Sequence, residues 1–290
     1  MNALEHVLDA LSDSAFVIHT TENYKGDPKV KVSPTDGANA HEYSFKVVSP
    51  PFVAEWVRLN GEGNLGGRFS KEKRQAKFEV TLKQGGLAKL AGIQADCIES
   101  CQLRFFNRLD EICNRVANHI FKDGRCALGA KSRILKTTKQ AVAILRGTSI
   151  ENISDDDPDL KKMFVKHFLG ARNPFVKTNR DGDKIVTLRK RVYQPSDWKD
   201  RSKPDVIVPI PILNADDKIL NEDNSEPIVK NGDLIHATFK MEPYILPNGA
   251  YGVSASLVSV TKIKSAPQQI GEKPKAKRQK LDILFSEFEK

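Results

Sequence analysis

Apolar and polar residues alternate most regularly near the C-terminal end of the chain, between Gly232 and Lys264. Apolar residues take every second position of a first segment (Ile235, Ala237, Phe239, Met241) and of a second (Val253, Ala255, Leu257). This period of two is typical of half-buried strands. Pro247-Asn248-Gly249 lies between the segments, and Asn and Gly tolerate the positive φ of a tight turn. The pattern predicts a β-hairpin, and Gly252 within its second strand indicates a bulge or close approach of other backbone.

A second hairpin is predicted between residues 171 and 193, around the turn signal Asp181-Gly182. Its second strand would place five residues on one face: Ile185, Thr187, Arg189, Arg191 and Tyr193. Further strands are expected at 15–18, 29–32 and 42–48. The 29–32 strand would have inward valines and exposed lysines. Pro209 and Pro211 restrict 206–213 to an edge strand, because proline cannot donate to a β-ladder.

Helical periodicity appears in three places. Leu4, Val7, Leu8 and Leu11 predict a short N-terminal helix over residues 2–11. A longer stripe with a 3.6-residue period runs from Leu103 to Ile120, within a helical region of about 87–122. After the acidic run 155–159, residues 160–169 read as a helix with Ser154 or Asp159 as its N-cap. The intervening stretch 128–149 is notable for its basic residues.

The C-terminal hairpin carries a family resemblance. Its matching residues are Gly232, Asp233, Phe239, Tyr244, Tyr251, Gly252, Val253, Ser254, Leu257 and Val260. This run resembles the C-terminal hairpin of the OB-fold single-stranded-DNA-binding proteins of bacteriophages and large DNA viruses. The resemblance is sharpest over residues 205–264. It implies a mainly β chain with helical insertions (α+β), folded as a partly open OB-fold-like barrel with a plugging helix.

The expected domain organisation follows from this resemblance and from composition. Residues 1–264 would form one nucleic-acid-binding domain, with helical insertions at about 87–122 and 155–170. Residues 265–290 lack apolar periodicity at first and read as a disordered basic linker that ends in an amphipathic motif. Residues 281, 284, 285 and 288 of that motif are candidate partner-binding positions: Leu281, Leu284, Phe285 and Phe288. A frayed terminus is the alternative.

Composition narrows the class of protein. The formal net charge is +9, and basic proteins often bind polyanions, although a solvated basic surface without a partner has the same charge. No apolar run approaches the ~20 residues of a membrane-spanning helix, and the N-terminus lacks a secretory signal. The four cysteines form no C-x-x-C pair, which favours reduced thiols in an intracellular protein over a zinc site. The glycine-rich stretch 60–67 lacks the spacing of a phosphate-binding loop.

Basic residues interleaved with aromatic ones are the candidate nucleic-acid-binding set. Cations follow phosphates while aromatic rings stack on bases, which is what sequence-tolerant binding of single strands needs. The candidates are Arg68, Phe69, Lys71, Lys73, Arg74, Lys77, Arg172, Lys177, Arg180, Lys184, Arg189, Lys190, Arg191, Tyr193, Trp198, Tyr244 and Tyr251. Two alternatives stay open: Phe78 and Val80 could point into a core beside merely solvated lysines, and Trp198 could seal the barrel edge.

Two other segments suggest different chemistry. The run Asp155 to Asp159 could bind a divalent metal for nuclease activity, but a solvated helix start is the simpler interpretation. Four tail residues (Lys275, Lys277, Arg278, Lys280) resemble a nuclear-import signal or a non-specific DNA contact.

The sequence therefore predicts a non-enzymatic protein that binds single-stranded DNA, with RNA left open, and that needs no metal or cofactor. We expect a viral protein of the host nucleus or a viral replication compartment, acting in replication, recombination or repair, with replication proteins as tail partners and a possible homo-oligomer. A partner-binding scaffold that acts through the C-terminal motif is the alternative function.

Overall fold

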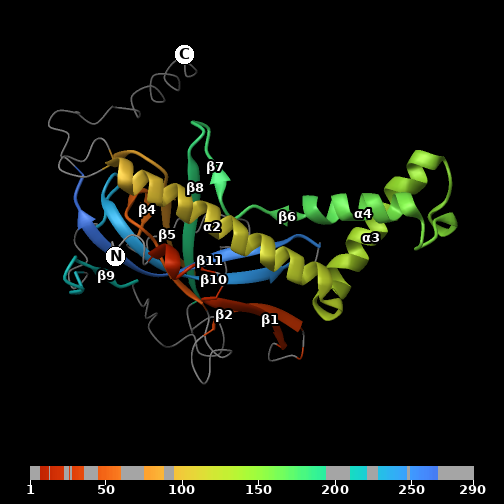
Figure 1. Cartoon of the computed structure of the whole chain (residues 1–290), viewed down its shortest axis with the longest axis horizontal. Helices are drawn as coiled ribbons and strands as arrows, with labels where there is room; N and C mark the ends of the chain where they lie inside the picture. Colours follow the sequence, from red (N-terminus) through yellow and green to blue (C-terminus); the bar gives the residue numbers. More distant parts are fainter. Residues whose placement is uncertain are drawn as a thin grey trace, which may run out of the picture.

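The computed structural model describes residues 7–12, 14–22, 26, 28–35, 45–59, 75–87, 95–193, 210–220, 228–246 and 249–266. Its centre is a barrel of five strands, drawn in Figure 1: β4 (Phe52–Arg58), β5 (Gln75–Lys83), β8 (Lys184–Tyr193), β10 (Leu234–Ile245) and β11 (Tyr251–Lys264). Neighbours follow the order β10-β4-β5-β8-β11, and β11 pairs back onto β10, which closes the ring. Of the pairings within this ring, only that between β8 and β11 is parallel. In chain order this ring is 1-2-3-5-4, the Greek-key topology of the OB-fold.

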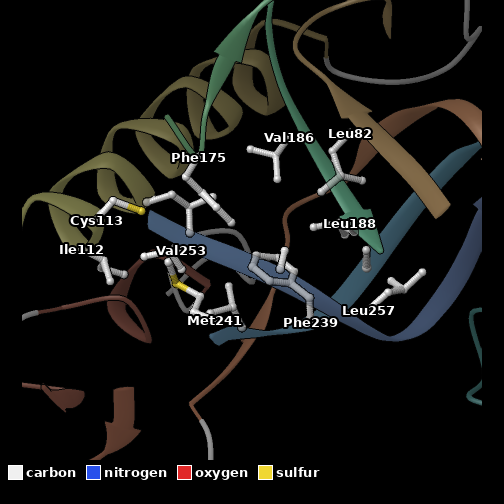
Figure 2. Packing of buried hydrophobic residues seen from close by; sticks show 14 of the residues in the cluster. Leu82, Ile112, Cys113, Phe175, Val186, Leu188, Phe239, Met241, Val253 and Leu257 are labelled. Atoms are coloured by element: carbon white, nitrogen blue, oxygen red, sulfur yellow. The ribbon is translucent and has the colours of Figure 1, made fainter. Parts of the chain in front are cut away.

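Alternation of side chains explains why these segments form a barrel. Successive residues of a strand face opposite sides of the sheet. The inward positions in the middle of each strand are apolar and pack as one core, part of which is shown in Figure 2. Phe78, Val80 and Leu82 are inward on β5, Val186 and Leu188 on β8, and Phe239 on β10, all at most 1% exposed. Phe78 therefore points into the core, one of the alternatives that the sequence left open, and its ring cannot stack on bases.

The C-terminal hairpin predicted from the sequence is confirmed. Strands β10 and β11 pair antiparallel over their whole lengths, from Leu234 opposite Lys264 to Ile245 opposite Tyr251. The 171–193 hairpin is also confirmed, although its first strand, β7 (Lys177–Thr178), is only two residues long. Strand β9 (Ile212–Leu213) pairs parallel with β11, and β6 (Arg172–Asn173) does the same at the other end of that strand.

The N-terminal part adds a small separate sheet. Strands β1 (Phe16–Glu22) and β2 (Pro28–Pro34) pair antiparallel, and β3 (Lys46–Val48) lies on the edge of β10. The prediction of inward valines is confirmed, because Val30 and Val32 are buried while Lys29 is exposed. Of the predicted N-terminal helix, residues 7–9 are helical and residues 1–6 lie outside the described residues.

Helix α2 (Ala95–Lys122) closes one end of the barrel. The amide of Gln102, which is fully buried, donates to the carbonyl of Pro51 just before β4 (2.8 Å), and its Oε1 accepts from the N–H of Gly85 just after β5 (2.9 Å). Phe105 and Phe106 contact the ring of Phe52 in the core. The predicted plugging helix is thus present. The predicted apolar stripe began at Leu103, which is wrong for this residue because its side chain is 40% exposed.

Two further helices project from the barrel, as Figure 1 shows: α3 (Gly124–Arg146) and α4 (Pro158–Gly170), joined through a 3-10 turn at Ile150–Asn152. The sequence reading assigned no helix to 128–149, because its many cations obscured the periodicity. The N-cap of α4 is Asp157 rather than Ser154 or Asp159. Its carboxylate accepts from the backbone N–H groups of Asp159 and Leu160, because Pro158 occupies the first turn. None of the described helices has the length and apolar character needed to span a membrane.

Candidate nucleic-acid interface

A surface groove of about 700 Å³ lies on the barrel. It runs between the β7–β8 hairpin and the turn end of the β10–β11 hairpin. In OB-folds the second and third strands and the loops that border them form the usual binding face. Here those strands are β5 and β8. The lining residues are Asn173, Pro174, Phe175, Lys177, Thr187, Arg189, Glu242, Tyr244, Leu246, Val253, Ser254, Ala255 and Ser256.

Arg189 stands where three strands meet. Its backbone pairs with Glu79 of β5 on one side and with Ser256 of β11 on the other. The Nε of Arg189 donates to Oε2 of Glu79 at 2.8 Å, and the arginine side chain remains 49% exposed. This geometry holds a cation at the edge of the groove while leaving part of the guanidinium accessible.

Tyr244 forms the opposite wall of the groove. Its hydroxyl oxygen accepts a hydrogen bond from Nδ2 of Asn173 at 2.8 Å. Gly252 lies directly beneath the ring, since a Cβ at this position would come within 3.0 Å of the Tyr244 hydroxyl and 3.1 Å of the Asn173 carbonyl. Of the two alternatives for Gly252, a bulge or a close approach, the structure shows the close approach, which allows the tyrosine to lie against β11. Tyr244 therefore presents a half-buried aromatic ring next to the groove.

Two more cations from the sequence-derived set lie on the same hairpin as Arg189. Lys177 on β7 is exposed and lines the groove, and Arg180 is exposed in the turn that follows. The groove also contains one acid, Glu242. Its charged lining residues are thus two cations and one carboxylate, with serine and threonine hydroxyls between them.

Other predicted cations lie elsewhere. Arg172 donates to Oδ1 of Asn114, and Lys184 donates to Oδ1 of Asn107 at 2.8 Å, so both are directed to helix α2. Between them lies Asp110, whose pKa is raised because burial outweighs the opposite effect of the two cations. Lys190 is half-buried. It lies on the same face of β8 as Val186 and Leu188, and Arg189 lies on the opposite face. These three residues are not part of the groove.

The expectation that Tyr251 offers a stacking surface is wrong. Its side chain is fully buried, and its ring stacks on Phe168 of α4 with centroids 4.7 Å apart and planes inclined by 27°. Burial raises the pKa of its hydroxyl to about 12. Tyr251 therefore joins helix α4 to the barrel.

Many of the predicted contacts lie outside the described residues: Arg68, Phe69, Lys71, Lys73, Arg74, Trp198, Lys275, Lys277, Arg278, Lys280, Leu281, Leu284, Phe285 and Phe288. For three other predicted contacts, Lys77, Arg191 and Tyr193, only the backbone is described. Lys77 pairs with Arg191, and Tyr193 pairs with Gln75. These positions continue β5 and β8 beyond the Arg189–Glu79 pair, toward the loop that connects β4 to β5. They remain predictions.

The acidic run that suggested a metal site is occupied by ion pairs. Asp155 lies 2.5 Å from Nζ of Lys139, and Asp156 lies 2.9 Å from Nζ of Lys161. Asp157 and Asp159 both accept from Arg146. The hydrogen bond from Arg146 lowers the pKa of the Asp157 carboxyl. These carboxylates cap and brace the α3–α4 connection, as the simpler interpretation of the sequence anticipated.

The cysteines divide into two groups. Cys101 and Cys113 are buried on α2, and burial raises the pKa of Cys113 to about 12. Cys97, near the start of the same helix, is exposed. The side chain of Cys126 lies outside the described part of the chain.

Sequence reasoning missed several residues of the groove. Asn173, Glu242 and Leu246 carry no pattern that marks them, because each is an ordinary polar or apolar residue near a strand end. Gly252 next to a tyrosine-containing hairpin was the one local signal of a close approach.

Comparison with known proteins gives only distant likenesses. No protein-family model matches the chain, and no curated protein matches it significantly. Among solved structures, the single-stranded-DNA-binding protein gp2.5 of bacteriophage T7 has a TM-score of 0.40 at 12% identity, over 79% of this chain and 97% of its own. The single-stranded-DNA-binding protein of bacteriophage Enc34 has a TM-score of 0.36 at 12% identity, over 90% and 98%.

Proposed function

We propose that this protein binds single-stranded DNA without sequence preference, in the groove beside β8. The observation that supports it most directly is the position of Arg189, Lys177 and Tyr244 around one groove that borders β8, the third strand of the OB-fold barrel. A strand in this groove would place phosphates near the two cations and a base on the tyrosine ring. Its role would be to hold single strands exposed in DNA replication, recombination or repair.

The chemistry of the groove suits a single strand better than a duplex. Phosphate contacts give affinity without reading sequence, and an aromatic ring can stack on any base that is unpaired. A duplex hides the faces of its bases inside the stack, so Tyr244 would have nothing to contact. The serine and threonine hydroxyls of the groove can donate to phosphate oxygens in either case.

The direct test is a titration of fluorescently labelled oligo-dT, and of a duplex of equal length, at several salt concentrations. We expect tighter binding of oligo-dT and a log-log salt slope of about −0.7 for each phosphate neutralised. Equal or tighter binding of the duplex would contradict the proposal. Oligo-U in a parallel titration decides between DNA and RNA.

A matched pair of variants locates the binding surface. Arg189→Gln should weaken oligo-dT binding and make the salt slope shallower by about 0.7, because one phosphate contact is lost. Lys162→Gln on the exposed face of α4 removes the same charge away from the groove and should leave the slope unchanged. Equal effects of the two variants would show that only net charge matters.

A further inference from the structure

Strand β4 contains a β-bulge that turns a tryptophan out of the barrel. Glu55 pairs with Thr81 and Arg58 pairs with Glu79, so β4 advances three residues while β5 advances two. Trp56 lies within this bulge, and its side chain is 66% exposed. Phe52 and Ala54 are buried before the bulge and Leu59 after it. Uninterrupted alternation from Phe52 and Ala54 would have directed residue 56 into the core.

The backbone of Trp56 is in an unfavourable conformation. Its φ is +50°, in the left-handed region that bulky residues rarely enter, and glycine normally occupies such a position in a bulge. The bulge is nevertheless held firmly. Oδ1 of Asn231 accepts from the N–H of Val57 at 2.9 Å, and the carbonyl of Ala54 accepts from the N–H of Gly232 at 2.8 Å. Residues held in such conformations, and bulges that re-aim a side chain, cluster at ligand sites.

Trp56 lies on the same face of the barrel as the proposed groove. The bulge ends where Arg58 pairs with Glu79 of β5, and the carboxylate of Glu79 accepts a hydrogen bond from Arg189 of β8. Two strand spacings, roughly 10 Å, therefore separate Trp56 from the strand of Arg189. Arg58, two residues after Trp56, is also exposed. An exposed indole beside arginines on an OB-fold surface combines the two features that bind single strands, a stacking ring and cations.

We propose that Trp56 stacks on a base of the bound strand, so that the strand continues from the groove across β5 onto β4. This inference rests on the proposed function, and it names a second contact zone outside the groove. Tyr244 and Trp56 would then mark the two ends of the contact, with Arg189 between them. The bulge would serve to display the indole at the expense of local backbone strain.

The chain offers a clean spectroscopic test, because Trp56 and Trp198 are its two tryptophans. In Trp198→Phe, Trp56 is the sole indole, and saturation with oligo-dT should quench its emission. Trp56→Phe, which retains only Trp198, is the matched control for quenching that arises elsewhere. Unchanged emission of the Trp56-only protein, under conditions in which labelled oligo-dT binds it fully, would overturn the inference and leave the proposed function intact. Failure of the wild-type protein to bind oligo-dT would overturn both.

A second variant separates binding from folding. Trp56→Gly removes the ring and suits the positive φ, so its melting temperature should equal or exceed that of the wild type. Its affinity for oligo-dT should fall about tenfold or more, the loss expected for one stacked base. Unchanged affinity in this folded variant would also overturn the inference.

Discussion

The guanidinium of Arg189 donates to the carboxylate of Glu79 across the β5–β8 pair at 2.8 Å, with the arginine 49% exposed and the glutamate 13% exposed. The two residues are opposite each other in the strand register. The carboxylate thus orients the arginine but also adds negative charge beside the proposed path of a polyanion. Positioning and repulsion act in opposite directions at this pair.

Glu79→Gln separates these two effects. The glutamine Oε1 can still accept the hydrogen bond from Arg189, whereas the negative charge is gone. We expect affinity for oligo-dT to rise about two- to five-fold at low salt, a size typical of one charge interaction near the protein surface. Titration with labelled oligo-dT measures this rise, which should shrink as salt is added. A fall in affinity would show that the charge of Glu79 is needed to hold Arg189.

Gly252→Ala tests the support of the tyrosine wall. The new Cβ would meet the Tyr244 hydroxyl at 3.0 Å and the Asn173 carbonyl at 3.1 Å, so the ring must shift. We expect a loss of about 1–3 kcal/mol in the free energy of unfolding, together with weaker oligo-dT binding. Urea denaturation measures the first effect. Gly170→Ala is the matched control: a Cβ there meets nothing within 4 Å, and its unfolding free energy should not fall.

Tyr251→Phe tests whether the buried Tyr251 contributes to binding. Within the described part of the chain, the buried hydroxyl of Tyr251 has no hydrogen-bond partner. Removing it should leave the free energy of unfolding unchanged or raise it by about 1 kcal/mol, because an unsatisfied buried polar group is costly. Oligo-dT affinity should not change, while Tyr244→Ala should weaken binding. Weaker oligo-dT binding by Tyr251→Phe would show that Tyr251 contributes to the interface.

His236 should make stability depend on pH. Its Nδ1 lies 2.7 Å from the carbonyl oxygen of Ser49, and burial lowers the pKa of its imidazole. The unfolded chain then takes up the proton at higher pH than the folded protein does. Stability from the neutral imidazole is therefore fully present above about pH 6.5 and is lost as pH falls toward the folded pKa. Urea denaturation between pH 7.5 and 5.5 should show this loss, and His236→Asn should reduce it.

Much of the barrel could be predicted from local pattern. The β10–β11 hairpin and the long helix α2 follow from strong periodicity and recognisable turns, and the pairing of β10 with β11 is between neighbours in the chain. Helix α3 could not be recognised in this way. Its cations at Lys131, Arg133, Lys136 and Lys139 interrupt the apolar stripe, and its packing against α4 through Val142 and Leu160 depends on tertiary structure.

The candidate site was predictable in part. Arg189 and Lys177 were found because cations on an exposed strand face show in the sequence. Tyr251 and Tyr244 were indistinguishable by composition, since each is an aromatic residue near the hairpin turn. Their neighbours decide the difference: Phe168 of α4 covers Tyr251, whereas Asn173 holds Tyr244 beside the groove.

The sequence alone determined the two strands of the β10–β11 hairpin and helix α2, because alternation and helical periodicity act over a few neighbouring residues. The tertiary structure alone decided which cations face the groove and which face α2, because those contacts join residues far apart in the chain. The tertiary structure also determined that Trp56 is exposed. Strand alternation directs residue 56 inward, and only the register of β4 against β5 shows the extra residue that turns the indole to the surface.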